Sequence, residues 1–117
     1  MIMLFGDQAS MHEARTPEWI RQMIQFMHRL NADLMHSGEL ILAEGLADPT
    51  QAKTVRFENG MPVVTDGPYA ESKESLAGFW IVDVEDEARA IEITSRVVAF
   101  IEGPVEVRRS ADAPPDV

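Results

Sequence analysis

The chain has 117 residues, with ten basic and twenty acidic side chains that give a formal net charge of −10. Its length fits one domain around a single core, and its 45% hydrophobic and 26% charged content is ordinary for a globular protein. The negative charge repels phosphate backbones and anionic lipids, and no cysteine is present for a disulfide or a thiolate site, so nucleic acid, membranes and thiol chemistry are not expected.

The first part of the chain predicts a strand, a helix and a second strand. Met1 to Phe5 form an apolar run too short for a signal peptide or a membrane span, so we expect a buried strand and a cytoplasmic protein. Thr16-Pro17-Glu18 gives an N-cap, a proline at the first helical position and an early acid. The helix is expected to end at Ser37-Gly38, and Leu40 to Ala43 to begin the next strand. Its expected apolar stripe comprises Ile20, Met23, Met27, Leu30 and Leu34.

The second part predicts a hairpin, a strand, a helix and a last strand. Residues 54–58 and 61–65 alternate in polarity around Asn59-Gly60, which is the strongest short signal for a type I′ turn. Residues 78–84 predict a further strand, and the acids that follow it favour the start of a second helix, which Gly103-Pro104 should end. Residues 105–108 predict the last strand.

The order of these elements predicts an α+β fold, a ferredoxin-like split βαβ arrangement with an inserted β-hairpin. We expect one domain over residues 1–109 and a disordered C-terminal tail over residues 110–117. Both helices should cover one face of an antiparallel sheet, leaving apolar residues on the other face. A homodimer that packs sheet on sheet would cover them.

The segment Asp66-Gly67-Pro68-Tyr69, followed by Ala70-Glu71-Ser72-Lys73-Glu74, resembles the DGPF branch of the YCII-related family, with Tyr69 where phenylalanine is usual. Glu44-Gly45-Leu46 also matches the family pattern. The resemblance covers nearly the whole chain and implies a dimeric α+β barrel. It also implies a genomic association, because DGPF proteins are often encoded beside extracytoplasmic-function sigma factors.

The candidate catalytic residues are Asp66, Glu71, Lys73 and His28. A carboxylate in the loop could act as a general base while Lys73 stabilises a developing anion. The same residues could instead form an Asx-turn at Asp66 and surface ion pairs at Lys73. His28 lies at the edge of the first helix's apolar stripe, near an expected pocket, and could carry a proton or only pack. Some relatives in the YCII-related group have a helix histidine paired with an aspartate as an acid–base dyad.

Glu44 is expected at the end of a mostly buried strand, where a carboxylate needs a partner such as Lys53, Arg56 or Lys73. It could form a structural ion pair or serve as a further acid of the pocket. No spaced histidine set, phosphate-binding loop or dinucleotide fingerprint is present. We therefore expect neither a metal nor a cofactor.

Two functions remain open at this point. One is a cofactor-free enzyme that abstracts a proton or eliminates a group next to a carbonyl of a small molecule. The other is a non-catalytic ligand-binding or regulatory module. A base and an electrophilic stabiliser converging in one closed pocket would favour the enzyme.

Overall fold

The computed structural model describes residues 1–6, 15–69 and 75–113, and it has the α+β class predicted from the sequence. A four-stranded sheet has the order β2-β5-β1-β6, with antiparallel neighbours throughout, and a separate two-stranded sheet joins β3 and β4. The described strands do not close into a barrel. The elements are β1 (Ile2–Phe5), α2 (Pro17–Ser37), β2 (Leu40–Gly45), the short 3-10 helix η1 (Pro49–Gln51), β3 (Lys53–Glu58), β4 (Met61–Asp66), β5 (Leu76–Val82), α3 (Glu87–Ile101) and β6 (Glu106–Val107).

The helix boundaries follow from caps that the sequence largely predicts. Thr16 Oγ1 accepts a hydrogen bond from the Trp19 amide at 3.1 Å, and Gly38 ends α2 with a φ of 79°. At α3 an aspartate, Asp86, is the N-cap. The expected stop at Gly103-Pro104 comes one residue earlier, because Glu102 itself takes the left-handed conformation, with a φ of 57°. Neither helix in the described ranges combines the length and apolarity needed to cross a membrane.

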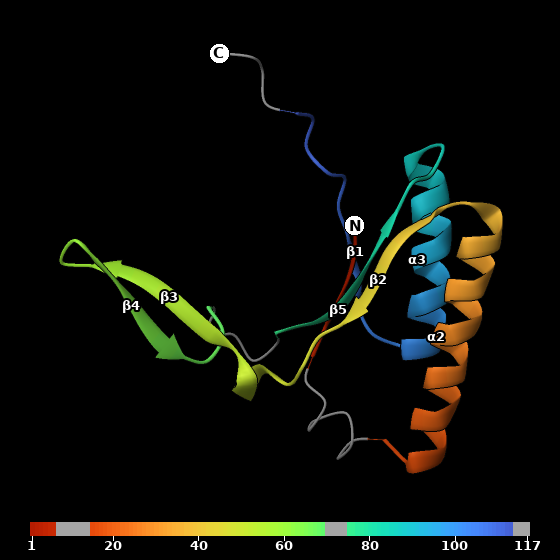
Figure 1. The fold of residues 1–117 in the computed structure, drawn as a ribbon. Coiled ribbons are helices and arrows are strands. Elements are labelled where there is room, and N and C mark those ends of the chain that lie inside the picture. Colours follow the sequence, from red (N-terminus) through yellow and green to blue (C-terminus); the bar gives the residue numbers. More distant parts are fainter. Residues whose placement is uncertain (7–14, 70–74, 114–117) are drawn as a thin grey trace.

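The core lies between the four-stranded sheet and the two helices, which cover one face of that sheet (Figure 1). Trp80 is almost fully buried there, and its Nε1 donates to Asn31 Oδ1 on α2 at 2.7 Å. On α3 the buried ridge is Ala90, Ile93, Thr94 and Val97. The Thr94 hydroxyl meets its hydrogen-bonding need by donating to the Ala90 carbonyl oxygen at 2.8 Å. Among the described residues, the largest fully buried side chains are Ile2, Leu30, Leu34, Ile93 and Val97.

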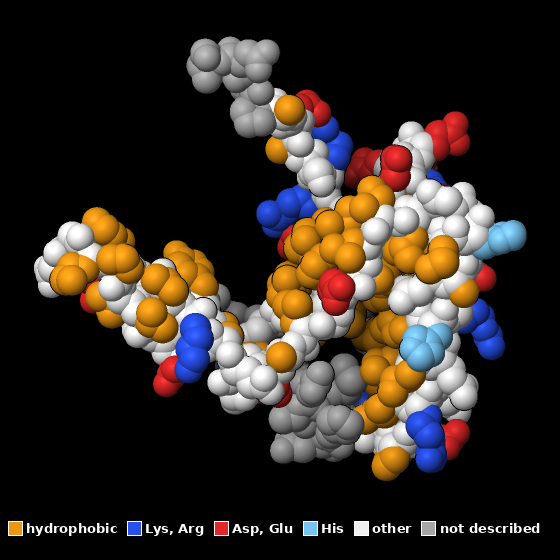
Figure 2. Space-filling model, in the orientation of Figure 1, with side chains coloured by type: hydrophobic (Ala, Val, Ile, Leu, Met, Phe, Trp, Pro, Cys, Tyr) orange, Lys and Arg blue, Asp and Glu red, His pale blue; other side chains and the backbone are white. Residues whose placement is uncertain are grey.

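The strand residues that alternate with this core form the open face, defined here by Met3, Phe5, Leu42, Glu44, Phe79 and Ile81. Met3 pairs with Phe79, which pairs with Glu44, while Ile81 pairs with Leu42. Because Trp80 points toward the helices, its neighbours Phe79 and Ile81 point away from them. Figure 2 shows hydrophobic side chains gathered over these strands.

Residues 53–66 form a hairpin arm that extends from the sheet on the side away from the helices (Figure 1). The predicted turn is confirmed, because Asn59 and Gly60 have φ values of 50° and 78°, as a type I′ turn requires. With the arm and the C-terminal segment extended, the radius of gyration is 16.8 Å, compared with roughly 13 Å for a compact domain of this length.

Candidate functional site

The structure places Asp66, a predicted general base, at the last position of β4. Its Oδ1 accepts a hydrogen bond from the Nζ of Lys53, the residue directly opposite in the β3–β4 register, and 86% of its side chain is exposed. The Gly67 amide donates to the Ala52 carbonyl oxygen at 2.9 Å, so backbone hydrogen bonding between the two strands continues one residue beyond Lys53 and Asp66. Asp66 is therefore part of a solvated cross-strand ion pair.

His28 lies on α2, where its side chain is exposed. Figure 1 shows α2 and the hairpin arm on opposite sides of the four-stranded sheet, so the structure does not bring His28 and Asp66 together. The expected pocket beside His28 is not found among the two cavities described below. Glu71 and Lys73 lie outside the described residues, and their roles stay a prediction.

A cavity of about 400 Å³, called the loop-end cavity here, lies where the sheet meets the base of the hairpin arm. Two of its lining residues, Pro68 and Ser75, stand at the two ends of the segment that carries Glu71 and Lys73. A backbone hydrogen bond fixes one side of the cavity, because the Ser75 carbonyl oxygen accepts from the Gly6 amide at 2.8 Å. Its described lining comprises Leu46, Ala47, Asp48, Pro49, Gln51, Ala52, Pro68, Ser75 and Leu76.

Asp48 is the one ionisable side chain in the described lining of the loop-end cavity. It caps η1, and its Oδ1 accepts from both the amide (3.0 Å) and the hydroxyl (2.9 Å) of Thr50. These two bonds lower the pKa of Asp48, the amide bond contributing most. An ionised, doubly hydrogen-bonded carboxylate is a weak proton acceptor, so a base for this cavity has to come from outside its described lining. The Asp-Pro-Thr spacing, an N-cap signal, could have revealed this role from the sequence.

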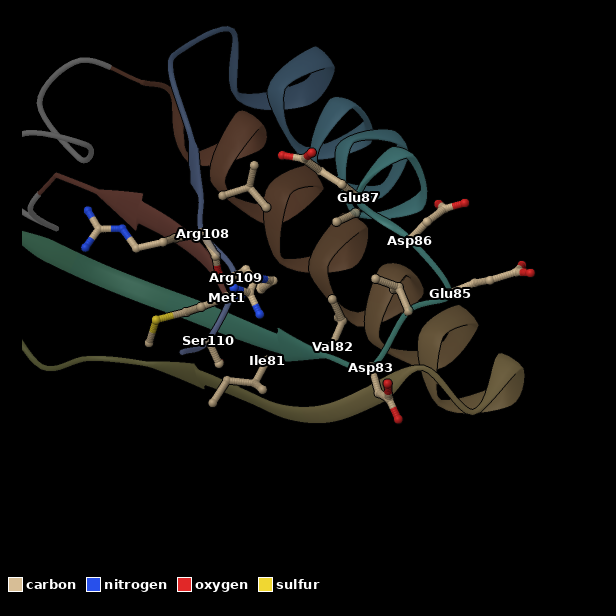
Figure 3. A pocket seen from close by; sticks show the side chains of 13 residues that line it. Met1, Ile81, Val82, Asp83, Glu85, Asp86, Glu87, Arg108, Arg109 and Ser110 are labelled. Carbon is tan, nitrogen blue, oxygen red and sulfur yellow. Dashed lines mark hydrogen bonds between the residues drawn. The ribbon is translucent and has the colours of Figure 1, made fainter. Parts of the chain in front are cut away.

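A second cavity, of about 480 Å³, lies between the start of α3 and residues 107–110 (Figure 3). Apolar side chains such as Ile81 and Val107 line part of it. Charged groups border it but do not converge: Figure 3 shows Glu85 and Asp86 pointing away from Arg109, whose guanidinium lies 3.2 Å from Asp112. Sequence reasoning missed this cavity because it depends on how the C-terminal segment passes the helix.

Glu44 differs from its expected setting in a mostly buried strand. It is exposed on the open face opposite Phe79, and within the described residues it has no ion pair. Glu106, paired with Met3, lies on the far side of the same cross-strand row, with its Oε2 2.6 Å from Arg108 Nη2. The row Glu106–Met3–Phe79–Glu44 thus places two apolar side chains between two carboxylates.

Gly78 is buried between Leu4 and Gly45, its partners in the two neighbouring strands. A Cβ at this position would lie 2.9 Å from the backbone oxygen of Glu44. The close approach of β5 to β2 therefore requires glycine. Among the described residues, no group of three or more histidine, aspartate or glutamate side chains is arranged to hold a metal ion.

Comparison with known proteins assigns the chain to a family. Residues 2–111 match the YCII-related domain. An uncharacterized protein of Rhizobium meliloti (strain 1021) is 28% identical over 91 residues, which cover 78% of this chain and 73% of that protein. Because the domain match spans nearly the whole chain, the protein belongs to the YCII-related family.

Proposed function

We propose that the protein binds a small carbonyl or carboxylate compound in the loop-end cavity and moves a proton on it without a cofactor. The observation that supports this is the position of the cavity, bordered by Pro68 and Ser75, the two ends of the segment that carries Glu71 and Lys73. Its volume of about 400 Å³ suits a small molecule, since ligand sites usually enclose ~300–1,000 Å³.

Glu71 is the proposed base and Lys73 the proposed anion stabiliser. Glu71 takes a proton from the carbon next to the carbonyl, and the electron pair of the broken C–H bond moves onto the carbonyl oxygen. The Lys73 ammonium stabilises the enolate oxygen, and the proton is then returned to carbon. The solvated pairing of Asp66 with Lys53 favours Glu71 over Asp66 for the first step.

The proposed assembly is a homodimer built on the open face. The sheet order β2-β5-β1-β6, with both helices on one face, supports a ferredoxin-like subunit. The apolar side chains of the open face support a partner that completes a dimeric α+β barrel. Asp66-Gly67-Pro68 supports placing the chain in the DGPF branch.

Hydrogen–deuterium exchange tests the proposed chemistry. The protein is incubated in D₂O with a panel of 2-oxo and 3-oxo carboxylic acids, and the protons next to each carbonyl are followed by NMR against a protein-free sample. We expect faster exchange for at least one compound, and its loss in Glu71→Gln. Glu58→Gln, an exposed acid at the end of β3, is the matched control and should keep the exchange.

The assay also separates the enzyme from a ligand-binding or regulatory module. Saturable binding of a panel member without accelerated exchange would favour the module. Exchange that persists in Glu71→Gln would remove this residue as the base. If no panel member binds or exchanges, the proposal for carbonyl chemistry fails.

A further inference from the structure

The hairpin arm is a small sheet without a third strand in the described part of the chain. Its two six-residue strands, β3 and β4, form a sheet of their own, and no other described strand pairs with them. A single two-stranded hairpin is at best marginally stable in water, and it needs packing against another surface. Within the described residues, no helix covers the arm as α2 and α3 cover the four-stranded sheet.

One face of the arm is a continuous apolar surface. The cross-strand pairs Val55–Val64 and Phe57–Pro62 lie on it, because residues two apart along a strand share a face. Val55 and Val64 are each 64% exposed and Phe57 is 77% exposed. The pair Lys53–Asp66 closes this face at the base of the arm. Large apolar residues gathered in this way usually mark an interaction surface.

The open face near β2 matches the arm in chemistry and length. Ile41 and Leu42 on this edge strand are 63% and 40% exposed, and Leu42 continues into the apolar pair with Ile81. A six-residue arm strand spans about 20 Å, close to the length of the seven-residue β5. Figure 2 shows hydrophobic side chains on both the arm and the sheet, with an open notch between them.

The neutral charge of the arm allows a second copy of this chain to be its partner. Lys53 and Arg56 balance Glu58 and Asp66, so the arm is neutral and the net charge of −10 lies in the rest of the chain. Two copies repel each other through that remainder, and the neutral arm is the surface that approaches a second copy at least electrostatic cost. Glu44, on the open face, adds a carboxylate that a lysine or arginine of a partner could meet.

We infer that two copies exchange hairpin arms, each arm packing its Val55–Phe57–Val64 face against the β2 side of the other copy's open face. The inference rests on the homodimer proposed above and adds the arm to its interface. The contact is reciprocal, so a twofold axis closes it and both arms are supported at once. Each copy then contributes both its apolar arm face and its open face, so the exposed apolar residues of β2, β3 and β4 are covered in both copies at once.

Cysteine cross-linking tests the exchange directly, because the native chain has no cysteine. Val55→Cys protein with a ¹⁵N label is mixed with unlabelled Leu42→Cys protein, allowed to equilibrate, and treated with a short bismaleimide. We expect a covalent product containing one labelled and one unlabelled chain. Met35→Cys, 70% exposed on α2, replaces Leu42→Cys in the control and should give no such product above background.

Sedimentation equilibrium of Phe57→Asp supplies an independent measurement. We expect the wild type to be dimeric at micromolar concentration and Phe57→Asp to dissociate at least tenfold more readily, whereas Met35→Asp stays dimeric. A folded wild-type monomer would overturn both the dimer and the exchange. If Phe57→Asp stays dimeric and no mixed cross-link forms, the proposed dimer stands but the exchange of hairpin arms is overturned. Neither result depends on the hydrogen–deuterium exchange assay that tests the proposed chemistry.

Discussion

Arg89 on α3 forms a bidentate ion pair with Glu39, the residue before β2. Arg89 Nε lies 2.9 Å from Glu39 Oε2, and Arg89 Nη2 lies 2.8 Å from Glu39 Oε1. The Ser37 hydroxyl donates to the same Oε1 at 2.7 Å. The Arg89 hydrogen bond is the main reason why the pKa of Glu39 falls to about 2, and the Ser37 bond lowers it further. One carboxylate thus ties the end of α2 and the entry of β2 to α3.

This pair predicts a loss of stability in acid. Glu39 is ionised more readily in the folded state than at its ordinary pKa of 4.5, so its contribution is complete above pH 4.5 and is lost as the pH falls toward 2. Glu39→Gln should lower the melting temperature at pH 7 and weaken the pH dependence between 4.5 and 2. Circular dichroism melts from pH 2 to 7 measure both effects. Glu92→Gln, which removes the more exposed partner of Arg89, should change the profile less; equal profiles for the two variants would contradict the prediction.

Gly78→Ala should force β5 and β2 apart. The new Cβ would lie 2.9 Å from the Glu44 backbone oxygen, which cannot rotate away as a side chain could. Overpacking of this kind usually costs about 1–3 kcal/mol of folding free energy. Gly45→Ala is the matched control on the neighbouring strand, because a Cβ there meets nothing within 4 Å. Urea unfolding of the two variants measures the difference, and equal midpoints would contradict the assigned register.

The elements that local chemistry determines were predictable from the sequence. Thr16-Pro17 and Asn59-Gly60 specify a helix start and a hairpin turn through their own backbone preferences, and both are confirmed. The end of α3 was not, because Glu102 adopts a left-handed cap that glycine would ordinarily take. The predicted last strand is also shorter, with only Glu106 and Val107 paired.

The candidate site was less predictable, because it depends on how distant segments pack. Sequence spacing placed Asp66 in a turn, but its pairing with Lys53 comes from the register of β3 against β4. Glu44 is exposed because it lies on the face of β2 that points away from the helices. The short apolar sequence of this strand does not show which of its residues point toward the helices. Glu71 and Lys73 lie outside the described residues, so their proposed roles depend on experiment.

Asn31→Leu should destabilise the core through Trp80. The substitution removes the acceptor of the Trp80 Nε1 hydrogen bond, and the indole is only 6% exposed. A buried donor left without a partner costs about 1–3 kcal/mol. Asn31→Asp, which keeps an acceptor oxygen, should cost less. A double-mutant cycle with Trp80→Phe checks the cause, because removing both partners should cost less than the sum of the single changes. Strict additivity would contradict the pairing.

Asp66→Asn should leave stability almost unchanged, because its pairing with Lys53 is solvated. The two side chains are 86% and 60% exposed, and exposed ion pairs contribute about 0.2–1 kcal/mol. If Asp66 serves only this pair, Lys53→Met should reproduce every effect of Asp66→Asn on unfolding by urea and on deuterium exchange. If Asp66 also contacts the ligand, Asp66→Asn should slow exchange while Lys53→Met does not. If both variants lose deuterium exchange on the compound but keep their stability, the Lys53–Asp66 pair supports the loop-end cavity. In that case, removal of either side chain has the same effect.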